Sequence, residues 1–172
     1  MKLRLMVGAL VTVVSLLAGS GAALAEQNTQ AFLLNSPQGS ETTTVTAVGV
    51  FNGVGREEEV SSRFNEGRNG RFTFAIKDSF VFKEGNLFLS IRGAGRTVFN
   101  EETCAGRGSG RASYRITNGT GIFDDARGAG RATFDFAFIG EKVNGECVEE
   151  DGSGVFFAKL LGTLRLRGSM AA

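Results

Sequence analysis

The stretch Arg127-Gly-Ala-Gly-Arg-Ala-Thr-Phe-Asp-Phe-Ala-Phe-Ile139 decides the fold class, because its large apolar residues recur at every second position. Phe134, Phe136 and Phe138 fall on one side of an extended chain, and Asp135 falls on the other. A period of two, rather than 3.6, predicts a β-strand with one buried face and one solvated face.

The same alternation recurs along most of the chain from Thr44 onward. It predicts strands at residues 44–54, 57–64, 71–83, 87–98, 106–117, 127–139 and 154–167. Short strands separated by frequent turns are typical of a β-sandwich or a β-barrel. One apolar face in each strand favours an antiparallel sheet, whose two faces can differ in this way.

A short repeat, Arg-Gly-small-Gly-Arg, occurs at residues 92–96, 107–111 and 127–131. An arginine- and glycine-rich nucleic-acid-binding segment is one alternative, but these copies lie within alternating strands of a nearly neutral chain. The alternation places the glycines inside and the arginines outside. Inward glycines let strands bend or leave space within a barrel. We expect the arginines to be surface charges opposite acidic clusters such as residues 57–59.

The N-terminal segment has the composition of a signal peptide. Lys2 and Arg4 precede an apolar run over residues 5–17, and Ala23-Leu-Ala25 is a typical cleavage site before Glu26. The apolar run is too short for a good membrane anchor, so we expect a secreted or periplasmic protein without stable membrane insertion. The expected organisation is a signal peptide (1–25), an irregular N-terminal arm (26–43) and a single barrel domain (44–172).

The cysteine and histidine content limits the chemistry. Cys104 and Cys147 are the only cysteines, and in an exported chain we expect them to form one disulfide. The absence of histidine excludes serine–histidine and cysteine–histidine nucleophile systems. Two cysteines cannot complete a usual zinc site, so we expect no metal, and no cofactor is needed.

The charge balance is nearly even. Lys2 and Arg4 account for two of the 19 basic side chains, so 17 remain against 18 acidic ones after cleavage. A net charge of −1 predicts no electrostatic attraction to nucleic acid or to an anionic membrane.

The stretch Tyr114-Arg-Ile-Thr-Asn-Gly-Thr-Gly-Ile-Phe-Asp-Asp-Ala-Arg-Gly128 resembles the signature of the allene oxide cyclase/dirigent superfamily. Gly119-Thr-Gly-Ile-Phe123 matches the core of that signature, and Ala126-Arg-Gly128 matches its ending, while Asn118 replaces the usual first glycine. The resemblance is strongest over residues 106–139. It implies an eight-stranded antiparallel β-barrel of the calycin type, often with an elongated apolar cavity.

The resemblance also implies a class of function. Family members cyclise a reactive fatty-acid epoxide or guide the coupling of phenolic radicals, so the expected protein binds a small apolar molecule and guides its cyclisation or isomerisation without a cofactor. A shaped cavity would lower the entropic part of the barrier. The alternative is a non-catalytic envelope or extracellular module, whose barrel is filled by its own phenylalanines, of which the chain has 15. The first interpretation allows enzyme activity and the second does not, and the sequence does not decide between them.

The alternation selects the candidate site residues. The candidate catalytic residues are Tyr114, the only tyrosine, and Asp78, which falls on an apolar face where burial would raise its pKa. A structural role for Tyr114 and a turn role for Asp78 are the alternatives. The expected lining of a ligand site comprises Phe72, Phe74, Ile76, Leu89, Ile91, Tyr114, Phe134, Phe136, Phe156 and Leu160.

Two further groups of residues have expected surface positions. Arg56 and Arg63 are candidate cations at the mouth of the cavity, and a plain surface position is the more common alternative for such residues. Val155, Phe157 and Leu161 fall on the outward side and form a candidate patch for a homodimer or homotrimer, which family members often form.

Overall fold

The computed structural model describes residues 28–37 and 42–166, apart from the side chains of residues 149–152. The predicted signal peptide and its cleavage site lie outside these residues. The regular elements are eight strands and two short 3-10 turns: β1 (Thr29–Pro37), β2 (Thr43–Gly49), β3 (Gly53–Glu66), η1 (Arg68–Gly70), β4 (Arg71–Phe82), β5 (Gly85–Asn100), β6 (Ala105–Gly119), η2 (Gly121–Phe123), β7 (Arg127–Val143) and β8 (Glu146–Arg165).

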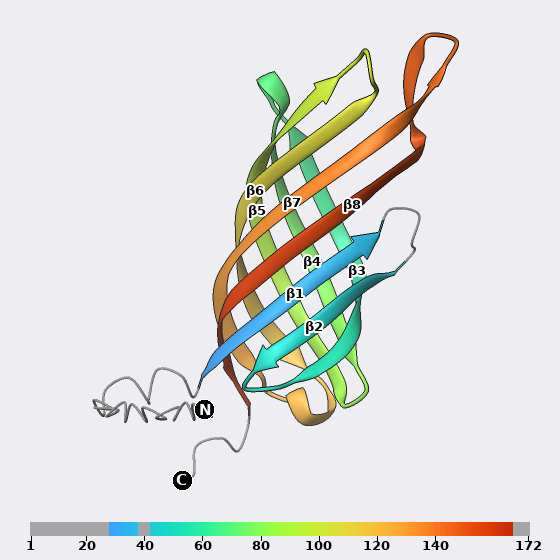
Figure 1. Ribbon diagram of the computed structural model, residues 1–172. Coiled ribbons are helices and arrows are strands. Elements are labelled where there is room, and N and C mark those ends of the chain that lie inside the picture. Colours follow the sequence, from blue (N-terminus) through green and yellow to red (C-terminus); the bar gives the residue numbers. More distant parts are fainter. Residues whose placement is uncertain (1–27, 38–41, 167–172) are drawn as a thin grey trace, which may run out of the picture.

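Each strand pairs in antiparallel fashion with the next strand along the chain, and β1 also pairs with β8. The sheet therefore closes in a ring, with strand order β1 to β8 (Figure 1). The predicted all-β class and the antiparallel pairing are confirmed. In the views shown, the turns β2–β3, β4–β5 and β6–β7 lie at the lower end, and the turns β5–β6 and β7–β8 lie at the upper end.

Two boundaries of the sequence prediction are wrong. The expected irregular arm contains β1, whose Phe32 and Leu34 are buried inside the ring between β2 and β8. The predicted strand over residues 44–54 ends instead at Gly49, where a Cβ would overlap the carbonyl oxygen of Thr29. A positive φ of 135° at Gly49 turns the chain there, and β3 then runs unbroken through residues 55 and 56.

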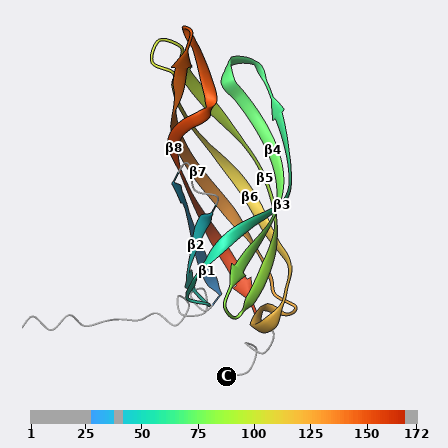
Figure 2. The same ribbon diagram turned by 90° about the vertical axis from the view of Figure 1, so that its right-hand side faces the viewer.

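The ring is closed in its lower half only. β1 pairs with β8 as far as Pro37 opposite Val155, and β2 pairs with β3 as far as Thr43 opposite Glu57. β1 and β2 contain 9 and 7 residues, whereas β8 contains 20. Above these last pairs, the described strands β3 and β8 each have one neighbour, and they stand apart in Figure 2. The upper half is therefore a curved sheet of β3 to β8 that is open on one side.

Aromatic side chains fill the lower half. Phe32 and Phe80 meet edge to face with 5.3 Å between ring centroids. Phe51 makes similar contacts with Phe82 and Phe123, at 5.0 and 4.9 Å, beside the lower turns. Phe32, Phe80 and Phe123 are completely buried, so this end of the ring has a packed core.

The segment that carries the superfamily resemblance closes this lower end. The N–H of Thr120 donates to the carbonyl of Asn86 (2.9 Å), and the Thr120 hydroxyl accepts from the N–H of Asn86 (3.0 Å). The N–H of Ile122 donates to Glu84 in the same β4–β5 turn (3.2 Å). These bonds hold η2 against that turn and direct Phe123 into the core, so the segment has a structural role.

The predicted disulfide is confirmed. Cys104, in the turn between β5 and β6, is bonded to Cys147 near the start of β8, 43 residues further along the chain. It ties together two hairpins that project from the upper end of the sheet.

Candidate functional site

The inner face of the open upper half carries a continuous aromatic surface. Its members, which we term the upper Phe surface, are Phe64, Phe72, Phe74, Phe99, Phe134, Phe136, Phe138 and Phe156. Neighbouring rings in this set lie 5.4 to 6.5 Å apart between centroids. Unlike the lower core, most of these rings remain partly exposed, and Phe64 is 57% exposed.

The glycines of the Arg-Gly-small-Gly-Arg repeats form the floor beneath these rings. Phe74 of β4 pairs with Gly93 of β5, and Phe134 of β7 pairs with Gly110 of β6. A Cβ at either glycine would overlap the phenyl ring of its partner. The same relation holds for the pairs Phe72–Gly95, Phe136–Gly108 and Phe138–Gly106. The expectation that inward glycines leave open volume is therefore wrong for Gly93, Gly95, Gly108 and Gly110 of the repeats, because an aromatic ring covers each of them.

The rings from the two sides meet above the glycines. Phe72 and Phe74 lean from β4 across β5, and Phe134 leans from β7 across β6. The centroid of Phe134 lies 6.1 Å from that of Phe72 and 5.4 Å from that of Phe74. The result is a contiguous apolar surface on the inner face, on the open side of the sheet.

A pair of carboxyl groups lies at the lower edge of this surface, where the ring closes. On the inner face of β4, Asp78 follows Phe74 and Ile76 and is only 2% exposed. Glu57 of β3 lies beside it, and the two carboxyl groups are hydrogen-bonded. Glu57 is also the residue opposite Thr43 in the last β2–β3 pair. The pair therefore marks the boundary between the packed lower half and the open upper half.

The environment of the pair favours retention of a proton. Burial raises the pKa of Asp78 to about 8, and the charge of Glu57, its hydrogen bond and the charge of Glu59 act in the same direction. Burial also raises the pKa of Glu57, although hydrogen bonds with Asp78 and Thr43 oppose that effect. At neutral pH, Asp78 thus keeps its proton and acts as the hydrogen-bond donor to Glu57. The other oxygen of Asp78, Oδ1, is buried without a hydrogen-bond partner.

Sequence reasoning selected Asp78 but missed Glu57, which was expected to lie in an exposed acidic cluster. The alternation in β3 puts Gly53, Gly55 and Glu57 on the inner face and Arg56 and Glu58 on the outer face. This pattern in the sequence could have revealed the inward carboxylate.

Arg56 occupies the plain surface position that was the alternative to a cavity mouth. Its guanidinium points outward and binds Glu58 at 2.7 Å. Arg63 is exposed on β3, above a register shift between Glu59 and Ser61.

Tyr114 lies inside the ring but does not join this carboxyl pair. It is 3% exposed, and its ring covers Gly130 of β7, on the side of β6 away from β4. Burial raises the pKa of Tyr114 to about 12, and its hydroxyl has no hydrogen-bond partner. A buried hydroxyl without a partner among the described residues is uncommon in folded proteins.

The predicted ligand-lining residues divide into two groups. Phe72, Phe74, Ile76, Phe136 and Phe156 lie on the inner face and are partly exposed. Leu89, Ile91, Tyr114 and Leu160 are buried in the packed core, and Phe134 is the buried member of the upper Phe surface.

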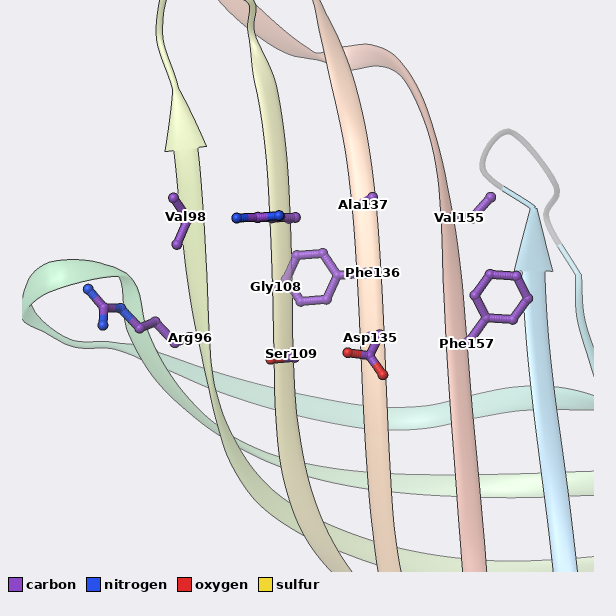
Figure 3. Close-up of a pocket in the computed structure, with 10 residues that line it drawn as sticks. Arg96, Val98, Gly108, Ser109, Asp135, Phe136, Ala137, Val155 and Phe157 are labelled. Carbon is purple, nitrogen blue, oxygen red and sulfur yellow. The ribbon is translucent and has the colours of Figure 1, made fainter.

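A separate pocket of about 470 Å³ lies on the outer face of β5 to β8 (Figure 3). Its wall consists of outward side chains, and the Phe136 ring and Gly108 show between β6 and β7. The outward members are Arg96, Val98, Arg107, Ser109, Asp135, Ala137, Val155 and Phe157. The outward orientation expected of Val155, Phe157 and Leu161 is thus observed, and these residues are 43%, 51% and 48% exposed.

Neither a metal centre nor a membrane-spanning helix is found in the described ranges 28–37 and 42–166. No group of three or more potential ligand side chains there could hold a metal ion, and no helix is long and apolar enough to cross a bilayer.

The fold and the interior define an all-β protein with a closed antiparallel sheet. Comparisons of the chain with protein-family models, curated proteins and solved structures found no match.

Proposed function

We propose that the protein binds a small apolar molecule on the upper Phe surface, with the Asp78–Glu57 pair at the polar end of the molecule. The observation that carries this proposal is the upper Phe surface itself, which is contiguous and only partly covered. Contiguous exposed apolar surface is costly in water, and on a soluble protein it commonly marks a binding site.

The dimensions of the site suggest the ligand class. From Phe74 to Asp78 the inner face of β4 runs for four residues, or about 13 Å. Aromatic rings prefer offset or edge-to-face contacts with another π-system. A molecule of that length with a ring or conjugated chain, and with one oxygen at its end, would match both the aromatic surface and the carboxyl pair.

The carboxyl pair adds a possible chemistry. Two hydrogen-bonded acids, one of them protonated, can donate a proton to one atom of a ligand and remove another, which is the proton transfer that isomerisation or cyclisation requires. This supports a cofactor-independent cyclase or isomerase of the allene oxide cyclase/dirigent type as the more specific form of the proposal. The closed antiparallel ring of eight strands supports the same relationship.

The alternative, a non-catalytic module with a filled barrel, is supported by the packed lower half. It does not account for the exposed rings of the upper half or for the buried polar atoms without partners. An exported location is part of the proposal, and the disulfide supports it because such bonds persist in oxidising compartments.

Titration with the neutral apolar fluorophore N-phenyl-1-naphthylamine tests the binding proposal. We expect saturable binding that weakens at least tenfold in Phe64→Ser/Phe99→Ser, which removes two exposed rings of the upper Phe surface. The matched control is Val54→Ser/Ile122→Ser, which removes two exposed apolar side chains elsewhere and should bind as the wild type does. Equal loss in both variants, or no saturable binding to the wild type, would contradict the proposal.

A further inference from the structure

The outer face of β5 to β8 concentrates positive charge. Between the pair Arg127–Arg165 and the pair Ile139–Ser153, its outward side chains include nine cations and a single acid, Asp135, all exposed. The cations are Arg92, Arg96, Arg107, Arg111, Arg115, Arg127, Arg131, Lys159 and Arg165. The near-zero net charge of the chain conceals this segregation, because acids such as Glu58, Glu84 and Asp124 lie on other strands and turns.

The strand register turns the arginine repeats into a continuous row. Arg92 is opposite Ser113, and Arg96 is opposite Ser109, so Arg111 lies diagonally between the two. Arg107 and Arg115 extend the row by one diagonal step at each end. Diagonal neighbours across an antiparallel pair are about 7–8 Å apart. Five guanidinium groups therefore follow the boundary between β5 and β6, separated by alanine and serine side chains.

Among the described side chains, none of these cations forms an ion pair with an acid. Within residues 28–37 and 42–166, the ion pair found is Arg56–Glu58, on β3. Like charges side by side on one sheet face repel each other. A row of close arginines on a face with one acid, Asp135, is thus a surface that an external anion would stabilise.

An apolar strip runs beside the basic row. Leu33 of β1 and Val155, Phe157 and Leu161 of β8 point outward and are 43% to 51% exposed. The outer pocket lies where the two strips meet, with Arg96 and Arg107 on one side and Val155 and Phe157 on the other (Figure 3). One face of the molecule thus combines cationic and apolar side chains.

We propose that this face docks on a membrane surface rich in anionic phospholipids. The arginine row would bind lipid phosphates, and the apolar strip would enter the boundary between headgroups and acyl chains. The outer pocket, with cations and apolar side chains on opposite sides, would receive one headgroup and the adjoining part of its chain. A hydrophilic polyanion such as a nucleic acid would match the basic row but leave the apolar strip in water. This docking is independent of ligand binding on the inner face.

Vesicle co-sedimentation tests the proposal with the disulfide-bonded protein. We expect binding to vesicles of phosphatidylglycerol and phosphatidylcholine, little binding to phosphatidylcholine alone, and a decrease as salt is raised. Arg92→Gln/Arg96→Gln/Arg111→Gln should weaken binding about a hundredfold. The charge-matched control Arg63→Gln/Arg68→Gln/Lys83→Gln alters exposed cations outside this face and should weaken it much less.

A second pair of variants distinguishes a membrane from a soluble polyanion. Phe157→Ser/Leu161→Ser should also weaken vesicle binding at least tenfold, whereas Val54→Ser/Ile122→Ser, on β3 and η2, should not. Equal binding to neutral vesicles, or equal effects of the charge variants and their control, would overturn the proposal. Tighter binding to a single-stranded oligonucleotide or to heparin, unaffected by the apolar variant, would overturn it in favour of a soluble polyanion.

Discussion

The carboxyl groups of Asp78 and Glu57, from neighbouring strands, are hydrogen-bonded inside the ring, at the level where the sheet changes from closed to open. Asp78 is 2% exposed, so its neutral form is favoured by burial before any partner is considered. Such a pair is costly for the folded state at high pH, which makes it accessible to stability measurements.

The first prediction concerns the pH dependence of stability. The pKa of Asp78 is about 8 in the folded state and near 4 when unfolded, so between these values the folded protein holds a proton that the unfolded chain has lost. The free energy of unfolding should therefore decrease as the pH rises from about 4 to 8, by up to about 1.4 kcal/mol per pH unit, and level off above that. Urea unfolding across this range measures the slope.

Asp78→Asn provides the control for that slope. The amide keeps a donor for Glu57 but cannot ionise, so the decrease should become much shallower and the variant should exceed the wild type in stability near pH 8. An unchanged slope in this variant would assign the pH dependence to other groups.

The second prediction uses Tyr114 as a spectroscopic probe, since the chain has one tyrosine and no tryptophan. Burial raises the pKa of Tyr114 to about 12, so the folded protein should show tyrosinate absorption only well above pH 10. In denaturant the midpoint should return to about 10. A midpoint near 10 under native conditions would show that the ring is solvated, contrary to the structure.

The third prediction concerns the glycine floor of the upper Phe surface. Gly110→Ala places a methyl group against the Phe134 ring and should lower the free energy of unfolding by about 1–3 kcal/mol. Adding Phe134→Leu to Gly110→Ala should cost less than the sum of the two single changes, because the shorter side chain leaves room for the methyl. Strict additivity in this double-mutant cycle would argue against the ring-over-glycine contact.

The fourth prediction concerns the disulfide. It closes a loop with a sequence separation of 43 residues, and Cys104→Ser/Cys147→Ser should reduce stability by about 2–4 kcal/mol. Since the bond lies at the tips of the upper hairpins, probe binding at the carboxyl pair should persist in the folded variant. Thermal unfolding with and without reductant provides the measurement, and a wild-type protein insensitive to reductant would contradict the prediction.

Local alternation accounts for what the sequence could predict. The sequence predicted the inner face of β4 correctly, because large apolar residues occupy every second position up to Asp78. β1 was missed because its buried residues, Gln30, Phe32 and Leu34, are few and lie in a polar segment. Glu57 was missed because three adjacent glutamates resemble a solvated run, although alternation turns Glu57 and Glu59 towards the inner face.

Strand register accounts for what local alternation could not predict. The pairing of Phe74 with Gly93, the diagonal row around Arg111 and the early end of the β2–β3 pairing at Thr43 all depend on contacts between distant segments. A shift of one residue in the register of a strand would turn its side chains to the opposite face and remove these contacts. For this reason the alternation showed which way the glycines and arginines point, but not that rings cover the glycines or that the arginines form a row.

Native mass spectrometry of the protein isolated from its own cells, followed by extraction of any bound compound, tests the central claim most directly. The account predicts a co-purified apolar compound with a conjugated or aromatic portion and one oxygen-bearing end, which Phe64→Ser/Phe99→Ser fails to retain. A wild-type protein that carries no such compound, and that also fails to bind N-phenyl-1-naphthylamine, would contradict a ligand-binding function and favour a structural module.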